Sequence, residues 1–164
     1  MKNLFYIFLG VVIVYLISVI YRGQVTPILA KFPIEEIEQK INKATDFYLV
    51  LFFTKSTCSP CVQQIVDLLN KLPENIRVVG IIKKEDLIFL DEIRNFSGAK
   101  FPIKTIKKWE RFRPNYVPTV FGVGQDGRIY FILACVGIEH AYLRAYLDEL
   151  LRKYNYLMSK PNLK

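Results

Sequence analysis

The stretch FFTKSTCSPC, residues 52–61, joins an apolar run to two cysteines that lie three positions apart. Before it, residues 46–53 read DFYLVLFF and are apolar on both alternating faces, which predicts a central strand covered on each side. After it, apolar residues recur at helical spacing across residues 62–72. We therefore expect Cys58 and Cys61 at the point where a buried strand passes into a helix.

The start of a helix is a favourable place for thiol chemistry, because unsatisfied backbone N–H groups and the positive end of the helix dipole stabilise a thiolate. A spacing of three residues on the first turn brings both sulfurs to one side of the helix, within bonding distance. Pro60 suits this turn because its missing N–H costs nothing there. We interpret Cys58 as an exposed nucleophile and Cys61 as a resolving thiol, with half of a metal site as the alternative.

The segments around this stretch predict an α/β domain. Residues 76–82, IRVVGII, predict a second buried strand, and the order strand, helix, strand predicts a right-handed parallel crossover. Residues 34–43 predict a short surface helix, and residues 87–96 predict a further helix that ends at Ser97 and Gly98.

The last third of the chain predicts a hairpin followed by a long helix. Residues 117–123 and 128–136 are the expected strands, because the GQDG between them is a hairpin signal. Residues 139–154 predict an amphipathic helix. Its expected inner side carries Tyr146, Leu147, Leu150, Leu151 and Tyr154.

The N-terminal segment carries eighteen uncharged residues at positions 4–21. As a helix they would be about 27 Å long, close to the roughly 30 Å of a bilayer's hydrocarbon core. A cleaved signal peptide has a shorter apolar region that ends in small residues, whereas the run here ends in the bulky residues of SVIYRG, residues 18–23. A buried core helix is the other alternative, but no polar face interrupts the run. We therefore expect a retained transmembrane helix, whose orientation charge counting leaves open.

These expectations divide the chain into four parts. Residues 1–22 are the anchor, 23–33 a tether, 34–156 the domain and 157–164 a tail.

The formal net charge is +8, and much of the positive excess lies in residues 100–113, which contain six basic residues and one acidic residue. A solvated basic surface is the simplest interpretation, and contact with anionic lipid headgroups is a weaker one. No nucleic-acid partner is expected, because no recognition motif accompanies the charge.

The order of these features resembles the thioredoxin superfamily across residues 34–154: a strand, CSPC opening a helix, a strand, then Pro118 opening a hairpin and a final helix. Within it the chain is similar to the membrane-anchored, extracytoplasmic branch typified by ResA and TlpA. The residues that point there are the N-terminal run, the FPI at 101–103 and the segment VPTVFGVGQDGRIY.

The resemblance implies a thioredoxin-like fold, a central mixed sheet flanked by helices, and a redox-active disulfide between Cys58 and Cys61. It implies a cis peptide bond at Pro118, with Val117, Pro118 and Thr119 binding the substrate. It also implies a single-pass membrane protein whose C-terminal domain faces the extracytoplasmic side and reduces disulfides in exported proteins. Electrons would come from a membrane dithiol donor, with no cofactor and no metal.

Two residues depart from the family's pattern. Thr57 stands directly before the first cysteine, where members often carry Trp. Phe52 stands six residues before that cysteine, where cytosolic thioredoxins carry a buried acid. Without this acid, removal of the proton from Cys61 needs another route.

Two other functions compete with redox exchange. Cys58, Cys61, Cys135 and His140 have spacings that zinc sites permit, although zinc pairs seldom lie between a buried strand and a helix. A non-catalytic thioredoxin-like interaction module is the other alternative. Cys135 itself is expected to be a small buried hydrophobe, with a third redox thiol as the less common use.

Overall fold

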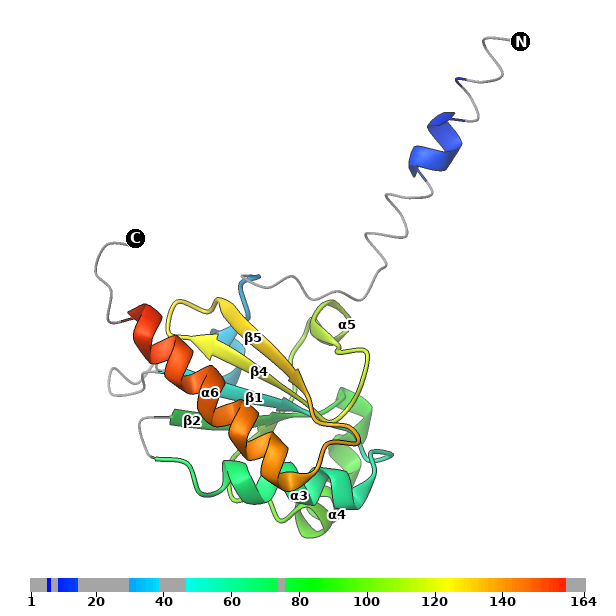
Figure 1. Cartoon of the computed structure of the whole chain (residues 1–164). Coiled ribbons are helices and arrows are strands. Elements are labelled where there is room, and N and C mark those ends of the chain that lie inside the picture. The colour runs from blue at the N-terminus through cyan, green and yellow to red at the C-terminus, as the bar shows by residue number, and fades with distance from the viewer. Residues whose placement is uncertain (1–5, 7–8, 15–29, 39–46, 74–75, 159–164) are drawn as a thin grey trace.

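A computed structural model describes residues 6, 9–14, 30–38, 47–73 and 76–158. In this part of the chain, five strands form one mixed sheet in the order β3-β2-β1-β4-β5 (Figure 1). The strands are β1 (Phe47–Phe52), β2 (Ile76–Ile81), β3 (Ile103–Lys104), β4 (Thr119–Gly124) and β5 (Ile129–Ala134). β1 pairs in parallel with β2 and antiparallel with β4, and β5 is antiparallel to β4. The predicted parallel crossover and hairpin are both confirmed.

Helices cover the two faces of the sheet. The face that carries the first hydrophobic core is covered by α3 (Ser59–Leu69), α4 (Leu90–Ser97) and α6 (His140–Met158). The opposite face carries the second hydrophobic core and is covered by α2 (Ile34–Ile37) and α5 (Trp109–Phe112). A 3₁₀-helix, η1 (Lys84–Phe89), connects β2 to α4. The predicted central mixed sheet flanked by helices is confirmed.

The central strand β1 holds the two cores together. All six of its residues are buried, and successive side chains alternate between the faces of a strand. Leu49 and Leu51 pack in the first core, whereas Tyr48, Val50 and Phe52 pack in the second. Apolar side chains on both faces of residues 46–53 therefore match a strand at the centre of the sheet.

Three helices differ from their predicted form. The helix expected over 87–96 begins as η1, in which Phe89 packs against the first core and Ile88 is 82% exposed, and α4 begins only at Leu90. In α6, Tyr146 is 52% exposed, so its placement on the inner side was wrong. Leu147 is buried as predicted, and Leu150 and Leu151 pack partly buried against the first core. Leu143, which the prediction left out, is fully buried four residues before Leu147. Of the helix expected over 34–43, the described part is α2.

Most of the predicted anchor, tether and tail lies outside the described residues. Within residues 4–21, only Tyr6 and residues 9–14 are described, and they are helical. Among the described residues, no helix has both the length and the apolar character needed to cross a bilayer.

Residues 30–32, which belong to the predicted tether, form a short bridge next to the start of β5. The N–H of Ile129 donates to the carbonyl of Ala30 at 3.1 Å, and that of Phe32 donates to the carbonyl of Gly127 at 2.7 Å. Gly127 lies in the turn between β4 and β5, and the end of β4 pairs with the start of β1. The chain therefore enters the domain at the end of the sheet where β1 begins.

Candidate active site

The two cysteines lie where β1 passes into α3, as predicted. Cys58 is the N-cap residue of α3, and its carbonyl accepts the first helical hydrogen bond, from the N–H of Val62 at 3.0 Å. Pro60 stands in the opening turn. The Cys58 thiol is exposed and the Cys61 thiol, one turn along, is half-buried.

The two thiols have opposite tendencies to ionise. The pKa of Cys58 is lowered, first because the Cys61 thiol donates a hydrogen bond to its sulfur and second because the Cys61 backbone N–H does the same. The pKa of Cys61 is raised, chiefly by giving its proton to that hydrogen bond and then by burial and the charge of Cys58. The backbone N–H of Gly137 works in the other direction by hydrogen bonding to the Cys61 sulfur. Cys58 is therefore the first to become a thiolate.

This order predicts how the thiols react as pH is varied. Iodoacetamide is expected to modify Cys58 at a lower pH than Cys61, because only the thiolate is nucleophilic. In a Cys58→Ser variant, Cys61 should react at a lower pH than in the wild type, because the neighbouring thiolate is gone. Peptide mass spectrometry across a pH series measures both. Equal profiles for the two thiols would contradict the assigned roles.

The turn before Cys58 is closed by hydroxyl groups. The Oγ1 of Thr57 accepts a hydrogen bond from the Thr54 N–H at 2.8 Å, and the Thr57 N–H donates to the Thr54 carbonyl at 3.0 Å. The Oγ1 of Thr54 lies 3.1 Å from that of Thr57 and 3.1 Å from the Oγ of Ser56. Thr54 and Thr57 are buried, whereas Ser56 is exposed.

Lys55 connects this turn to η1 and α4. Its backbone N–H donates to the Asp86 carboxylate at 3.3 Å, and its ammonium lies 3.2 Å from a carboxylate oxygen of Glu92. The same ammonium lies 3.3 Å from the centre of the Phe89 ring. No role is predicted from the sequence for the polar run TKST, residues 54–57. Its three-residue hydroxyl spacing is a signal for such a turn, whereas the partners of Lys55 are more than thirty positions away.

The start of β4 lies at the same end of the sheet as the cysteines, because Thr119 pairs with the last residue of β1. The peptide bond between Val117 and Pro118 is cis, as the resemblance implied. Val117 is half-buried, Pro118 and Thr119 are buried, and the Thr119 hydroxyl donates to the carbonyl of Tyr116 at 2.5 Å. The structure brings the three residues to the thiol end of the sheet, and their part in substrate binding stays a prediction.

Cys135 follows β5 and belongs to the core. It is 1% exposed, its N–H donates to the Pro118 carbonyl at 2.9 Å, and burial raises the pKa of its thiol to about 12. This favours the small-hydrophobe interpretation. Within the described residues, no three or more His, Cys, Asp or Glu side chains are grouped to hold a metal ion. The zinc set with Cys58, Cys61 and His140 is therefore not assembled.

Phe52 packs against three aromatic side chains. It is completely buried, and its ring centre lies 4.6 Å from that of Phe121, 5.4 Å from that of Trp109 and 6.3 Å from that of Phe32. The position six residues before Cys58 is thus part of the second core.

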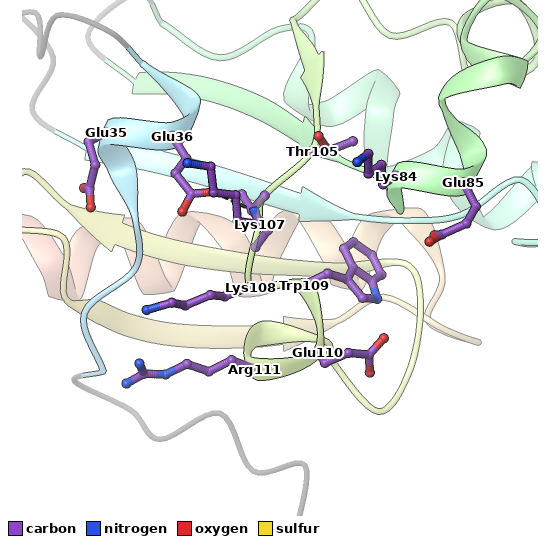
Figure 2. A pocket seen from close by; sticks show the side chains of 11 residues that line it. Glu35, Glu36, Lys84, Glu85, Thr105, Lys107, Lys108, Trp109, Glu110 and Arg111 are labelled. Carbon is purple, nitrogen blue, oxygen red and sulfur yellow. Dashed lines mark hydrogen bonds between the residues drawn. The ribbon is translucent and has the colours of Figure 1, made fainter.

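A surface hollow of about 1040 Å³ lies on the opposite face of the sheet from α3. Figure 2 shows its lining from α2, from η1 and from the loop into α5. Its charged side chains balance, with Lys84, Lys107, Lys108 and Arg111 against Glu35, Glu36, Glu85 and Glu110. Part of the basic run is also engaged locally, since the Lys104 ammonium donates to the Ile37 carbonyl at 2.6 Å. The balance of charges fits a solvated surface better than an anion site.

No family model matches the sequence, and no curated protein matches it. Among solved structures, the chain is similar to a thiol-disulfide isomerase from Corynebacterium glutamicum, with a TM-score of 0.52 and 16% identity over 77% of this chain and 97% of that one. It is also similar to an uncharacterized thioredoxin-like protein from Porphyromonas gingivalis, with a TM-score of 0.50 and 16% identity over 68% and 79% of the two chains. At these identities the likeness shows the fold.

Proposed function

We propose that this chain, which has the thioredoxin-like fold, is a thiol–disulfide oxidoreductase that works through Cys58 and Cys61. The observation that carries the proposal is the pair itself. An exposed thiol with a lowered pKa stands at the start of α3, beside a half-buried thiol with a raised pKa. The name of the Corynebacterium glutamicum neighbour is in keeping with exchange chemistry.

The mechanism follows from the different roles of the two thiols. The Cys58 thiolate attacks a substrate disulfide, so that one substrate sulfur bonds to Cys58 and the other leaves as a thiolate. Cys61 then loses its proton and attacks the Cys58 sulfur, which releases the second substrate thiolate and closes the Cys58–Cys61 disulfide. Two electrons pass from the dithiol to the substrate, and the released thiolates take up protons. The Gly137 N–H assists the second step by stabilising negative charge on Cys61.

The setting of this activity is also proposed. Residues 4–21 anchor the chain in the membrane, and the domain faces the extracytoplasmic side, where it reduces disulfides in exported proteins with electrons from a membrane dithiol donor. The uncharged run and the resemblance to the ResA and TlpA branch support this. Carbonate extraction of membranes and protease accessibility in intact cells test it, and release of the chain by carbonate would contradict the anchor.

A Cys61→Ala variant tests the function directly. Cys58 still attacks the substrate, but nothing resolves the mixed disulfide, so a covalent adduct should accumulate. Non-reducing electrophoresis detects it and mass spectrometry identifies the substrate. The matched control is the double variant Cys58→Ser with Cys61→Ala, which should trap nothing. Absence of any Cys58-dependent adduct, together with failure of the wild type to exchange with a model disulfide, would contradict the proposal.

A further inference from the structure

We propose that the hydroxyl groups of Thr54 and Thr57 position Cys58 for thiol exchange, a role that rests on the proposed function. They are positioning residues, because they act through the turn that carries Cys58 and take no part in bond exchange.

The two threonines close the turn directly before the nucleophile. The Thr57 Oγ1 accepts a hydrogen bond from the Thr54 N–H at 2.8 Å, and the Thr57 N–H donates one to the Thr54 carbonyl at 3.0 Å. Thr57 is the residue before Cys58, so the backbone that leaves this turn sets where the N-cap begins. The bond from the Thr54 N–H therefore depends on a single hydroxyl, that of Thr57.

Burial makes these hydroxyls hard to replace. Thr54 is 9% exposed and Thr57 is 7% exposed, so water does not readily substitute for a lost hydroxyl, and a Thr54 N–H without its acceptor would be an unpaired buried donor. Ser56 also reaches the Thr54 hydroxyl, but it is exposed and solvent can take its place. The structure therefore divides the three hydroxyls of the turn into two that fix it and one that does not.

Of the contacts that Lys55 makes, the ion pair contributes less to the position of the turn than the buried hydroxyl bonds do. Its ion pair with Glu92 is solvated, since the two side chains are 36% and 59% exposed, and exposed ion pairs stabilise little. The buried hydroxyl bonds therefore outweigh this contact.

The consequence for Cys58 is electrostatic. With the turn closed, the Cys58 sulfur is within reach of the Cys61 backbone N–H and thiol, which both favour its thiolate. With the turn open, the sulfur can leave these donors, and the thiolate loses their support. The turn thus controls how much of Cys58 is reactive near neutral pH.

Thr57→Val tests this, because valine keeps the shape and removes the hydroxyl. We expect alkylation of Cys58 by iodoacetamide near neutral pH to slow by about 3-fold to 10-fold, since each unit of pKa changes the thiolate fraction tenfold. The rates of variant and wild type should converge at high pH. Thr57→Ser should restore the wild-type profile, and Ser56→Ala should leave it unchanged. Tandem mass spectrometry assigns the modification to Cys58.

A folded Thr57→Val protein with the wild-type pH profile would overturn the proposal. Circular dichroism establishes folding, and Ser97→Ala, which removes a buried hydroxyl at the end of α4, controls for general loosening. If Thr57→Val does not fold, Thr54→Val is the second test. Alkylation of Cys58 should then slow by a smaller factor, because the Thr57 hydroxyl that accepts the Thr54 N–H remains. Alkylation needs no enzymatic turnover, so this outcome is separate from that of the Cys61→Ala trap.

Discussion

A Cys58→Ser variant is expected to lose thiol–disulfide exchange almost completely. Cys58 is the exposed member of the pair and the one whose pKa is lowered, so it supplies the attacking thiolate. A serine hydroxyl keeps the size of the side chain but does not ionise at neutral pH. The rate of reduction of a model disulfide such as insulin should fall by on the order of 10³-fold or more, since Cys61, the thiol that remains at the site, is half-buried.

The matched control is Cys135→Ala. Cys135 is a core residue whose thiol burial keeps protonated, so its removal should leave exchange unchanged. Cys61→Ala should differ from both, because it allows the first attack and blocks release. Retention of exchange by Cys58→Ser would assign the nucleophile to another thiol.

Phe52→Asp is expected to destabilise the fold severely, although the substitution introduces the acid that cytosolic thioredoxins carry at this position. The variant loses ring contacts with Phe121, Trp109 and Phe32, and deletion of a buried phenylalanine side chain costs about 3–5 kcal/mol. It also buries a carboxyl group, which adds roughly 1–3 kcal/mol if no partner is found. Urea denaturation measures the free energy of unfolding.

The loss should depend on pH with a defined sign. Burial raises the pKa of an aspartate, so the folded variant would hold its proton to a higher pH than the unfolded chain. Stability is then greatest below the unfolded pKa and falls as pH rises towards the folded pKa. Phe52→Leu, which keeps the site apolar, should cost less than about 1.5 kcal/mol and show no such dependence. Equal stability of the two variants would show that the second core accepts a carboxylate.

The sequence predicts the thiol pair and its setting well, because local patterns control both. β1 is apolar on both faces, α3 has apolar residues at helical spacing, and the hairpin carries its own turn signal. The strand β3 has only two residues, too few to show the alternation of apolar and polar side chains by which a strand is predicted. Tyr146 was misplaced because an aromatic ring three residues from Leu143 fits the periodicity of the buried face, and only packing decides whether it is covered.

The contacts that hold the site in place depend on residues far apart in the chain. Lys55 meets Asp86, Phe89 and Glu92 only after β2 has crossed, and the Gly137 N–H reaches Cys61 only after the hairpin has formed. Single-sequence periodicity contains no information about such pairs. The aromatic surroundings of Phe52 likewise come from three separate segments of the chain.

The bridge between Ala30–Phe32 and the start of β5 lies at the end of the sheet opposite the thiol pair. Residues Ala30–Phe32 join the end of the sheet where β1 begins, and α3, whose N-cap is Cys58, follows the other end of β1 (Figure 1). Six strand residues span about 20 Å, at roughly 3.3 Å each. Cys58 lies between the end of β1 and α3, so a partner that reaches this thiol approaches the end of the sheet opposite the one at which Ala30–Phe32 join it.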